Sequence, residues 1–272
     1  MNVRMFLGDA LVDAVAWDDR GLAYGESLFE TMRGHRGRVP WWMAHMVRLR
    51  RGAEALAMPL PDAARMQQEA EALLDGGVGV LKLQLTRGGG MRGYAPASDA
   101  PPFWMLSRHP LPASVDALDA IWCETRLAAQ PRLAGLKHGN RLEQVLAGAE
   151  VRAAGVDEGL MRDGEGHAIA ATAANLFILA DGRWRTPRLQ SCGVAGVMRE
   201  WALGELEADI ATLTPEAVET ADAVFLCNAV RGILPVRRLG AKAWPQVHPE
   251  IRDLQARLAR AQPGFDPSQE AS

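Results

Sequence analysis

The sequence predicts an α+β fold in two domains, because strand-like and helix-like segments are mixed in both halves of the 272-residue chain. Residues 1–110 form a smaller N-terminal part, and residues 115–262 form a larger C-terminal part. Between them, the segment HPLPAS has the proline content of a crossing segment. Residues 263–272 are polar and rich in proline and serine, so we expect a disordered tail.

The N-terminal part shows both the alternating pattern typical of strands and the spacing of apolar residues typical of helices. Alternation and turn signals predict strands over residues 3–8, 27–34, 38–42, 79–88 and 101–108. Apolar residues at helical spacing predict helices over residues 42–58 and 62–76. We expect 27–34 and 38–42 to pair as a hairpin, because only the turn HRGR separates them.

The C-terminal part continues with different elements. Strands are predicted over residues 118–125, 158–163, 167–181, 182–187 and 220–230. Helices are predicted over residues 141–155, 195–208 and 248–261.

Composition narrows the class of protein. A net charge of −3 gives no reason to expect nucleic acid or an acidic membrane surface as a partner. Cys123, Cys192 and Cys227 are far apart and lack metal-site spacing, which fits a reducing compartment. The six histidines form no ligand pair at helical spacing, so we predict no metal. The N-terminus lacks signal-peptide character and no apolar run is long enough to span a membrane, so we expect a cytoplasmic protein.

Lys137 is the first candidate for chemistry. Only Lys82, Lys137 and Lys242 are lysines among the 30 basic residues, and Lys137 follows the apolar segment LAGL. A desolvated lysine can lose its proton and attack a carbonyl group as an amine, whereas arginine cannot. A lysine retained in this arginine-rich chain indicates that an amine is required. The alternative is an ordinary lysine in a surface loop.

Three glycine-containing loops are candidates for binding anions. SCGVAGVMRE places a turn before a helix, where backbone N–H groups and the helix dipole suit a phosphate. TRGGGMRGY follows a strand and lacks both the Walker A pattern and the dinucleotide fingerprint. CNAVRGILP follows a buried strand and suits a phosphate or a carboxylate. An ordinary helix start and a mobile surface loop are the alternatives for the first two.

Seven segments together resemble a known family. In chain order they are RGLAYGESLFET, HMVRL, LTRGGGMRGY, LAGLKHGNRLEQ, AANLF, CGVAGVMRE and FLCNAVRGILPV. They resemble the class IV, fold-type IV pyridoxal-phosphate enzymes, and within these the aminodeoxychorismate lyase branch. The resemblance implies pyridoxal 5'-phosphate as cofactor, a homodimer, and a two-domain fold whose C-terminal domain carries the Schiff-base lysine.

The resemblance also implies roles for single residues. Lys137 aligns with the lysine that binds the cofactor and moves protons, and Arg48 aligns with an arginine that binds the cofactor's phosphate. Two turns are implied to contact the phosphate, at Val194, Ala195, Asn228 and Ala229. The candidates for binding the substrate's carboxylates are Arg92, Tyr94 and Arg231.

One position departs from the family. Its members carry a glutamate that pairs with the pyridine nitrogen of the cofactor, and counting back from Asn175 this position is Ala170. In a strand, Ala168 and Thr172 would share the face of Ala170. The Thr172 hydroxyl could then donate a hydrogen bond to an unprotonated nitrogen. Glu165 lies in a turn five positions earlier, and we do not expect it to substitute.

The activity implied by the resemblance is the conversion of 4-amino-4-deoxychorismate to 4-aminobenzoate and pyruvate in folate biosynthesis. Without the glutamate the cofactor ring is a weaker electron sink, which counts against transamination more than against a lyase reaction that ends in an aromatic product. Two alternatives stay open. One is a class IV aminotransferase acting on D-amino acids or branched-chain amino acids, and the other is a divergent homologue with weakened cofactor chemistry.

Overall fold

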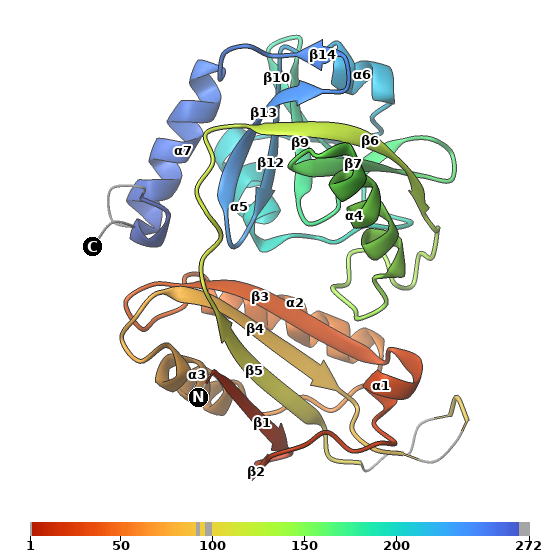
Figure 1. Cartoon of the computed structure of the whole chain (residues 1–272), viewed down its shortest axis with the longest axis vertical. Helices are drawn as coiled ribbons and strands as arrows, with labels where there is room; N and C mark the ends of the chain where they lie inside the picture. The colour runs from red at the N-terminus through yellow and green to blue at the C-terminus, as the bar shows by residue number, and fades with distance from the viewer. Residues whose placement is uncertain (1, 91–92, 96–99, 267–272) are drawn as a thin grey trace. The chain divides into compact units, whose positions relative to one another are not determined.

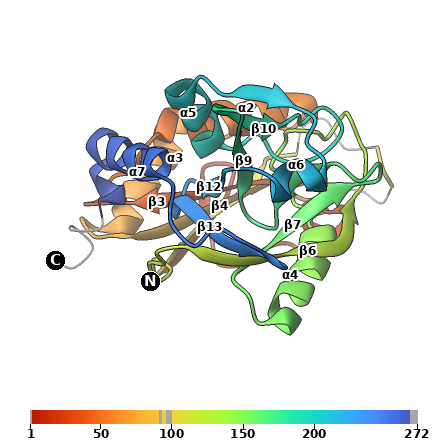
Figure 2. The same cartoon turned by 90° about the horizontal axis from the view of Figure 1, so that it is seen from above.

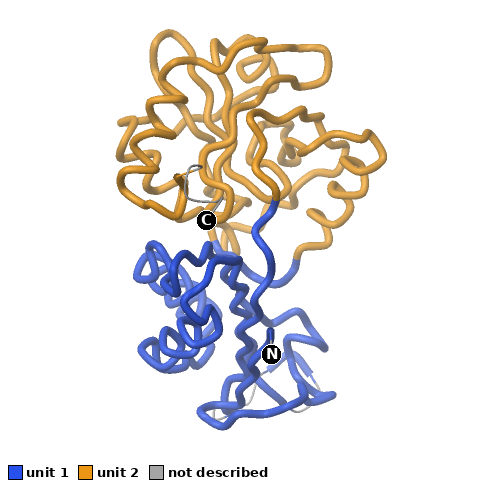
Figure 3. The backbone as a smooth tube through the Cα atoms, turned by 60° about the vertical axis from the view of Figure 1, so that its left-hand side comes forward, with its two compact units in different colours: residues 1–112, 136–140 blue, residues 113–135, 141–272 orange. Residues whose placement is uncertain are grey.

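Two β-sheets organise the chain, as Figure 1 and the view from above in Figure 2 show. The computed structural model describes residues 2–90, 93–95 and 100–266. Each sheet belongs to its own unit (Figure 3), the first made of residues 1–112 and 136–140 and the second of residues 113–135 and 141–272. Both units combine sheets with helices, so the fold is α+β.

The first unit is built on an antiparallel five-stranded sheet in the order β2-β1-β5-β4-β3. Its strands are β1 (Val3–Leu7), β2 (Ala10–Val12), β3 (Ser27–Gly34), β4 (Gly79–Thr86) and β5 (Phe103–His109). Its helices are α1 (Arg20–Tyr24), α2 (Trp42–Ala55) and α3 (Ala63–Leu74). The helices α2 and α3 begin at or next to the predicted residues, because their apolar side chains recur at helical spacing.

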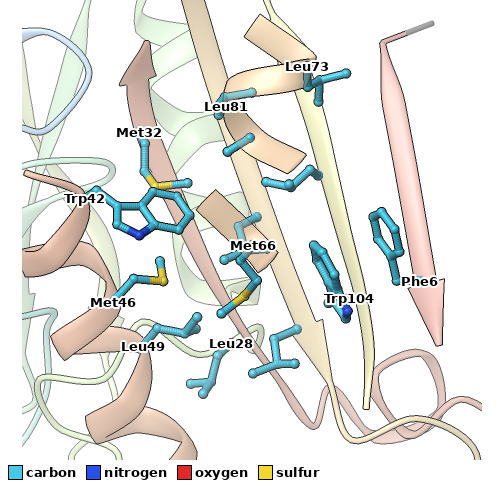
Figure 4. Close-up of a cluster of buried hydrophobic side chains, with 14 of the residues drawn as sticks. Phe6, Leu28, Met32, Trp42, Met46, Leu49, Met66, Leu73, Leu81 and Trp104 are labelled. Atoms are coloured by element: carbon cyan, nitrogen blue, oxygen red, sulfur yellow. The ribbon is translucent and has the colours of Figure 1, made fainter. Parts of the chain in front are cut away.

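The core of the first unit lies between its sheet and the helices α2 and α3 (Figure 4). The rings of Phe6 and Trp104 stack with centroids 4.0 Å apart. Leu28 of β3 packs close to Gly52 of α2, where an added Cβ would lie 2.8 Å from the Leu28 Cδ2 atom. Glycine at this position therefore lets α2 approach β3 closely, which matters for the charged residues that these two elements carry.

The predicted hairpin between residues 27–34 and 38–42 is wrong. Strand β3 pairs with β4 over its whole length instead. Pro40 has no N–H group to donate to a neighbouring strand, and Trp41 has a φ of +55°. Helix α2 then begins at Trp42, so this segment turns into a helix rather than returning as a strand.

The second unit is built on a nine-stranded sheet in the order β11-β10-β9-β12-β13-β6-β7-β8, with β14 beside β13. Because β8 also pairs with β9, part of the sheet closes into a ring. Its strands are β6 (Leu118–Leu127), β7 (Glu158–Asp163), β8 (Ala168–Ala171), β9 (Asn175–Ala180), β10 (Arg183–Pro187), β11 (Asp209–Ala211), β12 (Ala223–Asn228), β13 (Gly232–Leu239) and β14 (Lys242–Ala243).

Helices flank this sheet. They are α4 (Leu142–Ala154), α5 (Val197–Leu206), α6 (Pro215–Glu219) and α7 (Pro249–Ala261), followed by the short 3-10 helix η1 (Pro263–Phe265). Helix α4 lies along β6 and β7, whereas α5 contacts β12 and α7 contacts β13. Among the helices of the described residues, none has both the length and the apolar content needed to cross a membrane.

Two segments differ from the sequence-based expectation. Part of the loop predicted over CNAVRGILP forms the start of β13, which pairs with β12 as a hairpin. The first residues of the predicted tail form η1, because Phe265 packs beside Gly232, where an added Cβ would lie 3.1 Å from the Phe265 ring. Residues 267–272 lie outside the described residues.

Candidate active site

Lys137 lies in the segment 136–140, which belongs to the first unit and runs beside β3. This placement differs from the expectation that the lysine belongs to the C-terminal domain. The amide of Phe29 donates to the Lys137 carbonyl oxygen at 3.0 Å, and the amide of Gly139 donates to the Ser27 carbonyl oxygen at 2.7 Å. An added Cβ on Gly139 would lie 1.9 Å from the Ser27 Oγ atom, so a larger residue here would force the serine side chain to move.

The side chain of Lys137 contacts an aromatic ring. Its Nζ atom lies 4.3 Å from the centroid of the Phe29 ring, within the range of a cation–π contact. Lys82 reaches the same ring at 5.6 Å. The ring supplies the apolar surroundings that the segment LAGL predicts for Lys137.

Arg48 of α2 is held by the carboxylate of Glu30 on β3. The Arg48 Nε atom donates to Glu30 Oε1 at 2.8 Å, and Nη2 donates to Oε2. His45 lies one helical turn before Arg48, with its Nδ1 atom 2.7 Å from Glu30 Oε2. The Glu30 side chain is only 1% exposed. A buried carboxylate with these partners orients the guanidinium in a defined direction. Sequence reasoning missed Glu30 and His45, although HMVRL contains His45 beside Arg48.

Charge and burial set the ionisation of this cluster. Burial by itself would raise the pKa of Glu30, but the charge of Arg48 and the hydrogen bonds from Arg48 and His45 lower that pKa to about 2. Burial lowers the pKa of His45, and the charges of Arg48 and Lys137 lower it further, whereas Glu30 raises it. Near neutral pH the cluster therefore holds an ionised glutamate and a neutral histidine, within electrostatic reach of Lys137.

We expect the Glu30 ion pair to make the stability of the protein depend on pH in acid. The pKa of Glu30 is about 2 in the folded protein and ordinarily 4.5, so the stabilisation is complete above about pH 4.5 and is lost as the pH falls towards 2. Urea unfolding between about pH 6 and about pH 3 should show a steeper fall in the free energy of unfolding for the wild type than for Glu30→Gln. Parallel curves for the two proteins would contradict the assigned ion pair.

The first predicted phosphate turn precedes helix α5. The amide of Ala195 donates to the Gly135 carbonyl oxygen at 3.1 Å. This N–H group therefore already has an acceptor within the protein, and contact of the turn with a phosphate stays a prediction. The carbonyl of Val194 accepts a hydrogen bond from Asn175 Nδ2 at 2.8 Å. Asn175 thus holds the turn in place, a role that the sequence did not indicate.

The second predicted phosphate turn begins at Asn228, at the end of β12. Its Oδ1 atom accepts hydrogen bonds from the amides of Val230 at 3.0 Å and Arg231 at 2.8 Å, and its Nδ2 atom donates to the Ala173 carbonyl oxygen at 3.2 Å. The asparagine side chain therefore shapes the turn as a local cap. It fixes the main chain at Ala229 and Arg231, the two neighbouring candidates.

Ala170 is buried in the second unit. It packs in one cluster with Met161 and Cys123, whereas Ala168 packs with Leu160 in another cluster. The expectation that Ala168 and Ala170 share one face is wrong, because the pairing of β7 with β8 shifts register between these positions.

Thr172 is bonded to a glutamate of the neighbouring strand. Its hydroxyl donates to Glu158 Oε1, which also accepts the amides of Gly159 at 2.9 Å and Thr172 at 3.2 Å. A threonine hydroxyl has one proton. While it donates to Glu158, Thr172 cannot also donate to a pyridine nitrogen, so the cofactor contact of Thr172 stays a prediction. The side chain of Glu165 is 83% exposed and lies near His167.

The remaining candidates concern the substrate. Arg92 lies outside the described residues. Tyr94 belongs to the first unit, and its side chain is 89% exposed. Arg231 belongs to the second unit and is partly exposed. Within the part of the chain that the structure describes, no group of three or more His, Cys, Asp or Glu residues could hold a metal ion.

Known proteins resemble this chain along most of its length. Residues 27–239 match the family model described as amino-transferase class IV. The chain is 36% identical over 235 residues to an aminodeoxychorismate lyase of Vibrio harveyi, in an alignment that covers 82% of this chain and 86% of that protein.

Solved structures of similar proteins share the fold of this chain. The 4-amino-4-deoxychorismate lyase from Pseudomonas aeruginosa matches with a TM-score of 0.88 and 43% identity, covering 95% of this chain and 98% of that chain. A branched-chain amino acid aminotransferase of Escherichia coli shares the fold with a TM-score of 0.83 at 22% identity, over 93% of this chain and 92% of that chain. The family match spans well over half of the residues, and the chain belongs to the class IV aminotransferase family.

Proposed function

We propose that this chain is a pyridoxal-phosphate-dependent carbon–oxygen lyase that converts 4-amino-4-deoxychorismate to 4-aminobenzoate and pyruvate. The observation that carries the proposal is the Lys137 amine over the Phe29 ring, within electrostatic reach of the Glu30–His45–Arg48 cluster. The choice of substrate is supported by the lyases of this name that the chain resembles.

The residues of the first unit fit a cofactor that carries an aldehyde and a phosphate. Lys137 offers an amine that can bond to the aldehyde, and its main chain is fixed by β3. Arg48 offers a guanidinium, the side chain best suited to a phosphate, in an orientation fixed by Glu30. When bound, pyridoxal phosphate supplies an electron sink next to the carbon that loses a proton.

We assign the following roles. Lys137 would hold the cofactor through its amine, and its Nζ atom would remove and return protons at the substrate. Arg48 holds the phosphate, and Glu30 and His45 orient Arg48. The turns at 194–195 and 228–229 contribute to cofactor binding, with Asn175 and Asn228 fixing their main chains. Arg92, Tyr94 and Arg231 remain the candidates for binding the substrate's carboxylates.

Ala170 favours the lyase over an aminotransferase. A buried methyl group at this position gives the cofactor no anion to keep a ring nitrogen protonated. Amino-group transfer depends strongly on that anion. The lyase reaction ends in an aromatic product, and aromatisation supplies part of its driving force, so it tolerates the loss better.

We expect the purified protein to release 4-aminobenzoate from 4-amino-4-deoxychorismate and to react very slowly with alanine, glutamate or branched-chain amino acids. Fluorescence of 4-aminobenzoate after chromatography measures the first reaction, and stopped-flow absorbance of the bound cofactor measures the second. Rapid conversion of the cofactor to its amine form by any of these amino acids would make an aminotransferase the better assignment.

We further propose that the protein is a cytoplasmic homodimer that acts in folate biosynthesis. Helix α4 carries an exposed apolar row at helical spacing, with Leu142, Val145 and Leu146 exposed by 77%, 64% and 59%. Exposed apolar rows of this kind suit burial against another protein surface. Sedimentation equilibrium should give about twice the chain mass of 29.5 kDa. A monomer mass at micromolar concentration would contradict the dimer.

A further inference from the structure

Arg20 is buried although it opens the short helix α1 of the first unit. It is 3% exposed, and all three nitrogen atoms of its side chain donate hydrogen bonds. Nε donates to Glu26 Oε2 at 2.5 Å, Nη1 to the Gly93 carbonyl oxygen at 2.9 Å, and Nη2 to the Tyr94 carbonyl oxygen at 3.0 Å. Two of the three acceptors are therefore main-chain atoms of the loop that follows β4.

Glu26 links Arg20 to a second buried arginine. Arg87 Nε donates to Glu26 Oε1 at 2.6 Å, and its other two nitrogens donate to the carbonyl oxygens of Ala57 and Leu56 at 2.7 Å each. Burial by itself would raise the pKa of Glu26, but hydrogen bonds and charges of Arg20 and Arg87 lower it. The ionised Glu26 carboxylate thus links Arg20, which binds the loop, to Arg87, which binds the main chain just after helix α2.

Tyr24 holds the same loop from its own side. The amide of Gly93 donates to the Tyr24 hydroxyl at 3.1 Å, and the rings of Tyr24 and Tyr94 lie 5.7 Å apart. Gly93 is therefore bound at both its N–H and its C=O group. Its φ is +109°, with open space around an added Cβ. Glycine is needed here for the backbone conformation and not for room.

The Tyr94 side chain is exposed, although its main chain is held by a buried residue. Tyr94 has 89% of its surface accessible, although its carbonyl is bound by a guanidinium that is almost fully buried. A loop that only connects two strands needs no such anchor, because surface loops tolerate conformational variation. Burying an arginine costs free energy unless every donor is paired. The hydrogen bonds from Arg20 to the carbonyl oxygens of Gly93 and Tyr94 fix the main chain from which the Tyr94 side chain projects.

We infer that Arg20 is a positioning residue for substrate binding, which fixes the main chain at Gly93 and Tyr94 so that the Tyr94 side chain meets a carboxylate of the substrate. The inference rests on the proposed function, in which Tyr94 is one of the carboxylate contacts. It adds Arg20, with Glu26 and Tyr24 as its supports, to the residues that determine the KM of the reaction.

The test compares Arg20→Met with a matched control, Arg108→Met. Arg108 also donates to two main-chain carbonyls of the first unit, those of Leu73 at 3.3 Å and Val78 at 3.1 Å. These lie near the Gly79 end of β4, whereas the loop that Arg20 binds follows the other end of that strand. Both substitutions remove a guanidinium that binds main-chain oxygens, and only one of them concerns the loop of Tyr94.

Arg20→Met should raise the KM for 4-amino-4-deoxychorismate by about tenfold or more and change kcat by less than about threefold, because it weakens binding and leaves the chemistry intact. The visible absorption of the bound cofactor should stay unchanged. Arg108→Met should alter KM by less than about twofold. An unchanged KM in folded Arg20→Met, or an equal rise in both variants, would overturn the inference.

A double-mutant cycle tests whether Arg20 acts through Tyr94. If it does, adding Arg20→Met to Tyr94→Ala raises KM little beyond the effect of Tyr94→Ala alone. Multiplicative effects of the two substitutions would show that Arg20 acts independently and would overturn the inference. Gly93→Ala provides a second route to the same result, since it opposes the φ of +109° without a steric clash and should raise KM in the same way.

Failure of the proposed function is recognised separately. If the wild type forms no 4-aminobenzoate, the lyase assignment falls whatever Arg20 does. Calorimetric titration with chorismate, a related dicarboxylate, then decides the positioning role. A dissociation constant about tenfold weaker in Arg20→Met than in Arg108→Met would support it. Equal dissociation constants in the two variants, or no binding to the wild type, would overturn it.

Discussion

Replacing Lys137 by arginine should abolish 4-aminobenzoate formation, lowering kcat by at least about 10⁴-fold. Arginine keeps a positive charge near the Phe29 ring, which lies 4.3 Å from the Lys137 Nζ atom. It remains protonated, however, and cannot bond to an aldehyde or remove a proton. The variant should therefore stay folded, with a circular dichroism spectrum like that of the wild type.

Covalent labelling locates the amine directly. Borohydride reduction of the wild type followed by peptide mapping should place the cofactor on Lys137, and the same treatment of Lys137→Arg should leave no label. Lys82→Arg is the matched control, because Lys82 reaches the same aromatic ring at 5.6 Å. That control should keep its activity and its label. A label on Lys82 or Lys242 in the wild type, or no label at all, would remove Lys137 from the mechanism.

Replacing Arg48 by alanine should weaken pyridoxal phosphate binding about a hundredfold, since a lost charge-assisted pair is worth about 2–3 kcal/mol. Folding should suffer as well. Glu30 is only 1% exposed and would lose a principal partner. Leaving a buried carboxylate without its cation costs about 3–5 kcal/mol of stability. Fluorescence titration with the cofactor and urea unfolding measure the two effects.

A second variant separates cofactor binding from folding. Adding Glu30→Gln to Arg48→Ala removes the unpaired charge while keeping a hydrogen-bonding group beside His45. The double variant should recover much of the lost stability and should still bind the cofactor about a hundredfold more weakly than the wild type. If affinity recovers together with stability, Arg48 contributes to the fold and not to the phosphate site.

Local sequence was enough to predict much of the secondary structure. The periodicity of apolar residues predicted helices over 42–58 and 62–76, and the structure has α2 at Trp42–Ala55 and α3 at Ala63–Leu74. Periodicity reports which face of an element is buried, so it places elements well. It does not report which strands pair. The predicted partner of β3 was the segment 38–42, whereas the structure pairs β3 with β4.

Only the tertiary structure decided how the polar groups are used. The sequence shows that the Ala195 amide and the Thr172 hydroxyl can donate hydrogen bonds. The fold decides that their acceptors are the Gly135 carbonyl oxygen and the Glu158 carboxylate. Arg20 binds a carbonyl oxygen 73 residues away along the chain. The sequence determined which residues can donate a proton, accept one or act as an amine. Packing determined which partner each group meets, because a hydrogen bond forms only between groups that the whole fold brings within about 3 Å of each other.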